Sequence, residues 1–148
     1  MKHSLALAVL AAAIAAATLV GAAGFPERVI YVNHDKVAAA FVKGARVIEE
    51  PGLIVIANRG QQRGSEMHEH ANHVFIIYEG EAEFVTGGRM LDPKEISPGE
   101  TRGGAIEGGV SHHLAKGDVI TIPAKTPHWW KDTSRSGSVA YYAVNVIQ

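Results

Sequence analysis

Three histidines lie close together in the sequence, at positions 68, 70 and 73 of the string GSEMHEHANH. Imidazole nitrogens are common ligands of zinc, copper, iron and nickel, so the cluster favours a metal site. Side chains two positions apart on a β-strand point to the same face, so His68 and His70 can both face an interior. His73 has the opposite parity and joins them only if the chain turns or bulges at Ala71–Asn72. The alternative is a solvated surface cluster, although the apolar run VFIIY that follows is typical of a buried strand.

A fourth histidine, His128, follows a turn bounded by two prolines in the stretch GDVITIPAKTPHWW. Gly117–Asp118 predicts a turn, VITI predicts a strand, and PAKTP predicts a second turn that leads into the strand of His128. A single histidine after a proline turn is usually structural. Together with the three histidines upstream, His128 becomes a candidate fourth metal ligand.

The segments that would hold these histidines carry the turn pattern of an all-β protein. Short apolar and β-branched runs alternate with turn residues, which favours a sandwich or a closed barrel. The predicted strands are residues 46–49, 53–58, 74–78, 81–86, 119–122, 128–131 and 139–146. The segment 87–110 is rich in glycine and poor in large apolar residues, so we expect a long loop or irregular hairpin at one end of the barrel.

One short helix is predicted before the strands, over Asp35–Lys43. This stretch is rich in alanine, either Asn33 or Asp35 can cap its start, and Gly44 favours its end. A chain of 148 residues is long enough for one hydrophobic core, so the helix and strands are expected to form a single domain.

The first 24 residues have the pattern of a secretory signal peptide. Lys2 and His3 precede an uncharged apolar stretch over residues 5–20, and small residues follow at 21–24. We expect cleavage near Phe25, a mature domain over residues 25–148, a periplasmic or secreted location, and no membrane attachment after cleavage. The alternative is an uncleaved anchor helix, but the stretch is short for a bilayer and consists largely of alanine.

The composition argues against several other classes of function. The formal net charge is -1 and the charges are spread along the chain, whereas a nucleic-acid surface would show a basic stripe. The chain has no cysteine, which removes disulfides, thiolate ligands and thiol nucleophiles. No Ser/His/Asp arrangement and no phosphate-binding glycine loop stands out. Histidine-based metal chemistry is the strongest signal in the chain.

The two histidine motifs, taken in order, resemble those of the cupin superfamily. The first motif of that family has a glycine, H-x-H, a glutamate and a second glycine, which here correspond to Gly64, His68, His70, His73 in place of the glutamate, and Gly80. The second motif corresponds to Gly117, Pro123, Lys125 in place of a glycine, His128, and Asp132 in place of an asparagine. The resemblance covers residues 64–132, and the flanking strands fit the same barrel.

This resemblance implies the cupin fold, a double-stranded β-helix or jelly-roll barrel, preceded here by the short helix. It also implies one divalent metal ion, which could be Fe, Mn, Cu, Ni or Zn, held by His68, His70, His73 and His128. Four neutral imidazoles would leave the full charge on the metal, so the site should favour an anionic ligand. Many small cupins pair as dimers, so a homodimer is possible.

Further residues are candidates for the wall of the binding pocket. They are Phe75, Tyr78, His112 and Trp130. Glu66 and Glu69 flank the histidines and are either exposed charges or partners for imidazole N–H groups. No catalytic residue can be named beyond the metal ligands.

Two functions fit these features. The first is a metal-dependent enzyme that acts on a small oxygenated or aromatic anion, by oxygenation as the first choice and by isomerase or lyase chemistry otherwise. The second is a non-catalytic module that binds a metal or a small ligand in the same cavity. In both, the partner is a small molecule and not a nucleic acid.

Overall fold

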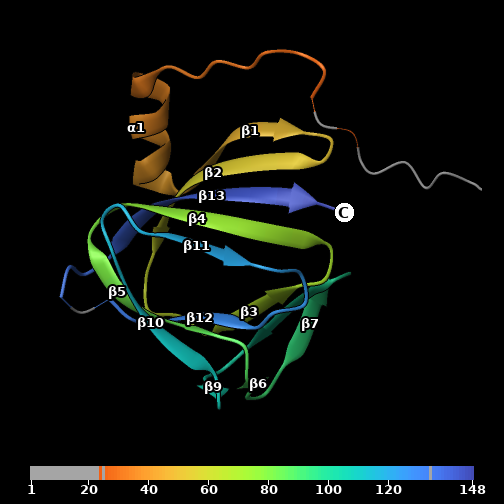
Figure 1. Cartoon of the computed structure of the whole chain (residues 1–148), viewed down its shortest axis with the longest axis vertical. Helices are drawn as coiled ribbons and strands as arrows, with labels where there is room; N and C mark the ends of the chain where they lie inside the picture. The colour runs from red at the N-terminus through yellow and green to blue at the C-terminus, as the bar shows by residue number, and fades with distance from the viewer. Residues whose placement is uncertain (1–23, 25, 134) are drawn as a thin grey trace, which may run out of the picture.

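The structure, a computed structural model, describes residues 24, 26–133 and 135–148 and consists of packed β-sheets with one helix on the outside (Figure 1). This confirms the predicted all-β architecture. The predicted signal peptide lies outside the described residues, apart from Gly24. Within the described ranges, no helix combines the length and the apolar character needed to cross a membrane.

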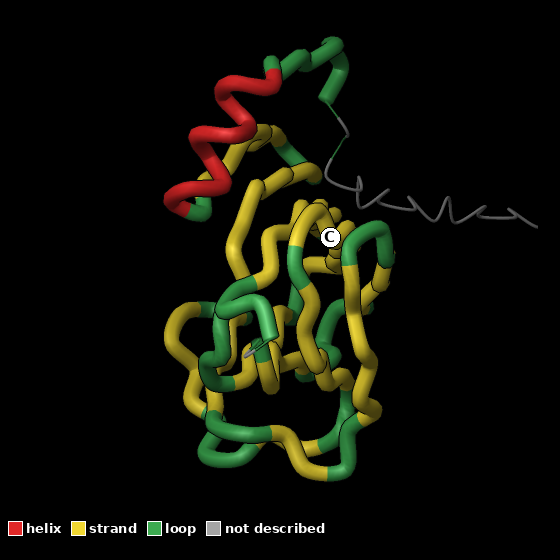
Figure 2. Tube along the Cα trace, turned by 90° about the vertical axis from the view of Figure 1, so that its left-hand side faces the viewer, coloured by secondary structure: helices red, strands yellow, loops and turns green. Residues whose placement is uncertain are grey.

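Two antiparallel sheets face each other and enclose the interior (Figures 1 and 2). The first sheet has the order β1 (Ala45–Glu50), β2 (Leu53–Gly60), β13 (Val139–Ile147), β4 (Ala71–Glu79) and β11 (Val119–Ile122). The second has the order β10 (Val110–Ala115), β5 (Glu81–Thr86), β12 (His128–Asp132), β3 (Ser65–His68), β8 (Glu100–Gly103) and β7 (Lys94–Ser97). Strands far apart in sequence are therefore neighbours, which brings residues 65–75 and 128 to one region.

The glycine-rich segment 87–110 is more regular than its sequence predicts. It contains the strand pair β6 (Arg89–Met90) and β9 (Ile106–Glu107), and between them the hairpin of β7 and β8. Most of its side chains are exposed or half-buried, so backbone pairing holds these strands more than apolar burial does. A pattern-based prediction depends on apolar alternation and therefore misses them.

The helix α1 (His34–Lys43) confirms the predicted helix and its caps. The side chain of Asn33 accepts a hydrogen bond from the Lys36 N–H at 3.0 Å, and Gly44 ends the helix in a left-handed conformation with a φ of 67°. Phe41 packs from this helix onto the outer face of the first sheet, where it meets Tyr142 and Ala140. The helix is thus a cover on the outside, and the interior between the sheets stays free for a site.

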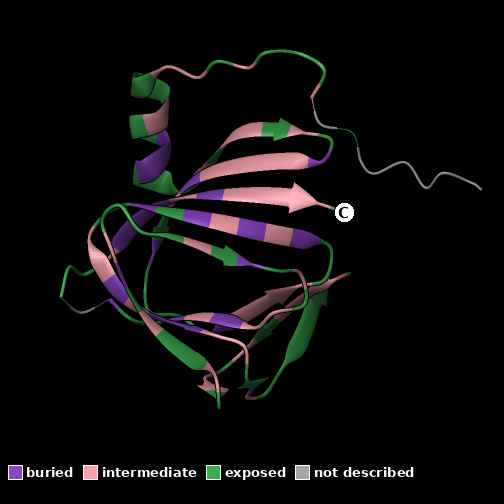
Figure 3. Ribbon diagram, in the orientation of Figure 1, coloured by how far each residue is buried: buried purple, intermediate pink, exposed green. Residues whose placement is uncertain are grey.

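Residues of β4 alternate between buried and more exposed, and the buried ones lie at two different ends of the interior. Ala71, His73, Phe75 and Ile77 are the buried residues of this strand, and the residues between them are more exposed (Figure 3). Phe75 and Ile77 join an apolar core with Phe84, Trp130 and Tyr141, among others. Ala71 and His73 lie at the other end of the strand, where the core gives way to polar side chains.

Candidate metal centre

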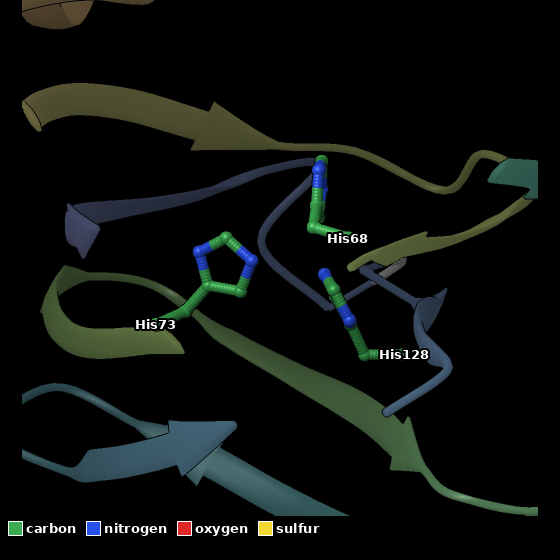
Figure 4. A group of neighbouring side chains, drawn as sticks. All are labelled: His68, His73 and His128. Carbon is green, nitrogen blue, oxygen red and sulfur yellow. The ribbon is translucent and has the colours of Figure 1, made fainter. Parts of the chain in front are cut away.

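Three of the four predicted histidines meet between the two sheets. His68 ends β3, His73 lies on β4 and His128 begins β12 (Figure 4). One ring nitrogen from each lies within 4.8 Å of the other two. The ring centroids are 4.8 Å apart for His68 and His73, 5.3 Å for His73 and His128, and 5.7 Å for His68 and His128. This is the arrangement expected of imidazoles that share one metal ion.

The hydrogen bonds of two of these histidines leave one ring nitrogen free. Nδ1 of His73 lies 2.7 Å from Oδ1 of Asn145, and Nδ1 of His128 lies 3.0 Å from the carbonyl oxygen of Thr126. Both oxygens accept hydrogen bonds, so the ring proton belongs on Nδ1 in each case. Both Nε2 atoms are buried and make no close hydrogen bond among the described residues; a carboxylate oxygen of Glu66 lies 3.4 Å from that of His128, and none is near that of His73. An unpaired buried nitrogen is costly unless something binds it, and a metal ion fits that requirement.

Burial also favours the neutral form of two of the rings, those of His68 and His73. Loss of water contact lowers the pKa of His73 to about 4, although the hydrogen bond to Asn145 acts in the opposite direction. Burial likewise lowers the pKa of His68, and the nearby carboxylate of Glu66 partly opposes it. Neutral imidazoles have the free lone pair that metal coordination needs, so these two rings are ready to bind a metal at neutral pH.

Glu66 lies beside the three histidines, on the same face of β3 as His68 because the two are two positions apart. Its Oε1 is 3.4 Å from Nε2 of His128, and its Oε2 is 3.0 Å from Nη1 of Arg102. Burial would raise the pKa of Glu66, but His128, Arg102 and His68 together lower it to about 2. Glu66 is therefore an ionised carboxylate next to the histidines. The sequence contains its signal, the E-x-H spacing, but this spacing fits an exposed charge equally well.

Arg102 is itself held by a second carboxylate. Its Nη2 and Nε lie 2.9 Å and 3.2 Å from Oε1 of Glu100, the residue two positions before it on β8. A planar guanidinium held on two sides keeps the Glu66 carboxylate in one orientation.

His70 does not reach the other three histidines. Its side chain is 69% exposed, and its nearest charged neighbour is Glu69, at 4.0 Å. The prediction placed His68 and His70 on one strand face, but β3 ends at His68 and the chain bends at Glu69–His70. The required turn therefore lies two residues earlier than the predicted Ala71–Asn72. Because β4 begins at Ala71, the His73 side chain points inward, as the His70 side chain was expected to do.

The turn before His128 is bonded to the end of β3 and so holds the second histidine motif in place relative to the first. Lys125 adopts a left-handed conformation with a φ of 63°, as the glycine that it replaces in the motif would. Its backbone N–H donates to the carbonyl oxygen of His68 at 2.8 Å. This bond ties the end of β3 to the turn that delivers His128, so the two motifs are held in register.

A cavity of about 380 Å³ opens beside the histidines. Its apolar wall includes Ile54, Ile56, Phe75 and Ala143, and its polar wall includes Glu66 and Arg102. This volume suits a small ligand with one apolar side and a few oxygen atoms.

The other predicted pocket residues lie outside this cavity. Trp130 is in the core and lines a smaller neighbouring cavity. Tyr78 is 51% exposed and stacks on Phe41 on the outer face, because it is out of phase with inward-facing Ile77. His112 lies on β10, where its Nε2 is 2.9 Å from Oγ1 of Thr86.

We expect the metal-free protein to lose about 2 kcal/mol of stability between pH 7 and pH 5, a value estimated for His73 alone. Its pKa is about 4 in the folded state, below the ordinary value of 6.5 in the unfolded chain. The unfolded state therefore binds more protons in this range, so stability falls as the pH falls. The lowered pKa of His68 acts in the same direction. Glu66 adds its effect only below about pH 4.5, where the unfolded chain begins to take up its proton.

Urea unfolding in the presence of a chelator, at several pH values between 5 and 7, measures this loss. His73→Gln should flatten the dependence, because its side chain cannot take up the proton. An equal slope in the wild type and in His73→Gln would contradict the assignment.

Comparison with known proteins gives one family and several related folds. The family model described as Cupin matches residues 52–147. The crystal structure of FeII HppE is 15% identical with a TM-score of 0.54, and the match covers 84% of this chain and 65% of that one. Fe(II)-HppE with the alternative substrate (S)-1-HPP is 16% identical with a TM-score of 0.52, covering 69% of this chain and 48% of that one. At these identities the likeness concerns the fold.

A further structure is less similar. Hydroquinone 1,2-dioxygenase from Sphingomonas sp. TTNP3 with 4-hydroxybenzoate bound is 15% identical with a TM-score of 0.47, covering 84% of this chain and 82% of that one. This chain matches only about half the length of the HppE complex with (S)-1-HPP. No sequence among the curated proteins matches it.

Proposed function

The chain belongs to the cupin family, and from that premise we propose that it is an exported enzyme in which one divalent metal ion acts on a small oxygenated or aromatic anion. The observation that carries the proposal is the buried Nε2 of His73, which has no partner among the described residues, together with its convergence with His68 and His128 beside a cavity. A residue set that served only packing would not leave a buried ring nitrogen unpaired beside two other imidazoles.

In this proposal, the metal is held by His68, His73 and His128, with Glu66 as the adjacent carboxylate. A bound metal would polarise a substrate oxygen or, if it is redox-active, activate O2, which makes oxygenation the first choice. Three neutral imidazoles and one carboxylate leave a net charge of +1 on a divalent ion. One anionic ligand balances that charge, which supports an enolate, phenolate or carboxylate as substrate. The donor set admits Fe, Mn, Cu, Ni and Zn.

The residues around the site either orient the histidine ligands or shape the cavity. Asn145 and the carbonyl of Thr126 fix the tautomer of His73 and His128. Phe75 lines the cavity and contacts His73, at 5.7 Å between ring centroids, so it excludes water from that side. These features orient the ligands and shape the cavity, while proton transfer is left to the substrate and the metal centre.

Metal analysis followed by oxygen uptake tests the proposal. The purified protein should contain about one equivalent of a divalent metal and should consume O2 with one member of a panel of catechols, enols and keto acids. His128→Ala should lose both properties. Oxygen consumption that survives His128→Ala would contradict the metal centre assigned here.

A non-catalytic binding module is the second candidate. The observation that favours it is the pairing of both cavity carboxylates, since Glu66 and Glu100 are each held by Arg102 and neither is free to act as a general base. A metal-loaded protein that binds a panel compound and returns it unchanged, with or without O2, would establish this function instead.

Export to the periplasm or the medium is part of the same proposal and rests on the pattern of residues 1–24. The expected product begins near Phe25, which intact mass measurement of the protein from the periplasm or medium would show. A homodimer in solution is also proposed, and light scattering would measure the mass of the particle.

A further inference from the structure

A second, smaller cavity adjoins the metal-side cavity and has a volume of about 100 Å³. The two cavities share four lining residues, the hydrogen-bonded pair Asn58 and Tyr141 and the ion pair Glu66 and Arg102. These two pairs form the boundary between the cavities. The small cavity is therefore next to Glu66, the carboxylate beside the proposed metal ligands, but is separate from the metal-side cavity.

The charge around the small cavity is positive. Three guanidinium groups line it, those of Arg59, Arg63 and Arg102, against the single carboxylate of Glu66. Neither Arg59 nor Arg63 has a carboxylate within ion-pair distance in the described part of the chain. Arg59 donates from Nε to the carbonyl oxygen of Phe41 at 3.1 Å and from Nη1 to Oγ of Ser138 at 3.4 Å, which leaves its other N–H groups available. Tyr141 stays neutral because burial raises the pKa of its hydroxyl. A guanidinium group without a carboxylate partner has N–H donors that are suited to bind an oxyanion.

A buried hydrogen-bond donor at this cavity also lacks a bond of ordinary geometry. The Nε1 of Trp130 is buried, in a residue only 7% exposed, and makes no such bond among the described residues, although it interacts with the neighbouring Tyr141 hydroxyl. Gly60 gives the cavity access to this ring, since a Cβ at that position would lie 2.9 Å from Cε2 of the indole, the carbon bonded to Nε1. An indole N–H is a donor only, so the group that completes this site must be an acceptor.

From this combination we propose that the small cavity binds a carboxylate or a similar small oxyanion through Arg63, Arg59 and the Trp130 indole N–H. Its volume of about 100 Å³ is that of a few water molecules, enough for such a group and too small for a ring. The anion is either the charged end of a substrate whose other end lies at the metal, which rests on the proposed function, or a separate small ion.

The site can be observed directly through the indole. The chain has two tryptophans, so a ¹H–¹⁵N correlation spectrum shows two indole signals, and Trp129→Phe assigns them. We would titrate the metal-free protein with sodium acetate, using sodium chloride to keep the ionic strength constant. The Trp130 signal should shift in a saturable way with acetate and not with chloride alone.

Two arginine variants decide whether the small cavity is responsible. Arg63→Gln should weaken acetate binding by about tenfold or more, since a charge-assisted hydrogen bond is lost. Arg89→Gln is the matched control, because Arg89 pairs with Glu107 on the β6–β9 ribbon, and it should bind acetate as the wild type does. An indole signal that does not move, or equal binding by the two variants, would overturn the proposal whatever the metal content.

The metal-loaded protein then identifies the source of the anion. Catechol and 3,4-dihydroxybenzoate present the same metal-binding oxygens, but only the second carries a carboxylate. If the carboxylate belongs to the substrate, 3,4-dihydroxybenzoate should bind at least about tenfold more tightly, and Arg63→Gln should remove that advantage. Equal affinities together with acetate binding would assign the cavity to a separate ion. A protein that takes up no metal but still binds acetate would remove the proposed function and keep this site.

Discussion

Replacing His128 with alanine should lower the affinity for a divalent metal by about a hundredfold or more, whereas replacing His70 with alanine should leave it unchanged. Loss of a group that merely orients a ligand costs about 10–100-fold, so loss of the ligand itself should cost more. His128 is 1% exposed and belongs to the group of three converging imidazoles, while the His70 side chain is 69% exposed and lies outside the group. Competition with a chromophoric chelator for Co(II) or Zn(II) would measure both affinities.

His70→Ala is the matched control because both changes delete one imidazole from a chain with 8 histidines. Circular dichroism and thermal unfolding of the metal-free variants would separate a loss of ligand from a loss of fold. Equal loss of affinity in the two variants would return His70 to the site and restore the four-histidine set that the motif resemblance implies.

Glu66→Gln should lower metal affinity by about 10–100-fold, the range seen when a group supporting a metal site is lost. The change keeps the shape of the side chain but removes a negative charge that lies 3.4 Å from Nε2 of His128. A carboxylate that stays ionised with a pKa of about 2 is present over the whole working range of pH, so its loss should be felt throughout. The measurement is the same chelator competition, repeated at low and high ionic strength.

Glu69→Gln is the control for this experiment, since Glu69 is in the same segment and its side chain is 48% exposed. Arg102 stays paired with Glu100 in the Glu66 variant, so the guanidinium is not left without a partner. Unchanged affinity in Glu66→Gln would mean that the carboxylate holds Arg102 and does not interact with the metal.

Much of the fold follows from local chemistry. The runs around residues 53–58 and 139–146 are mostly apolar and contain several Val or Ile residues, and the structure makes them long central strands, β2 and β13. Asn33, one of the two predicted N-cap candidates, and Gly44 mark the ends of the helix, because capping depends on a few neighbouring residues. The fold also brings His68, His73 and His128 together, although they come from three different strands.

The exact ligand set could not be predicted, because it depends on where one strand ends. The parity rule holds within a strand, and nothing in the string HEHANH indicates that β3 stops at His68 and not two residues later. Because β3 ends at His68, Glu66 and not His70 is the residue that shares the inward face with His68. The stop is set by distant contacts, such as the hydrogen bond from Lys125 N–H to the carbonyl of His68, which spacing along the chain does not reveal.

The position of β13 in the fold affects the order in which the site can be assembled during synthesis. This strand follows every other described strand in the chain, yet it lies in the middle of the first sheet, between β2 and β4. It supplies Asn145, which fixes the ring of His73, as well as Tyr141 and Ala143 of the cavity wall. A nascent chain on the ribosome therefore cannot close the sheet, or orient His73, until residue 145 has emerged. Metal capture should consequently follow the emergence of residue 145, and not accompany the folding of the strands that carry the three histidines.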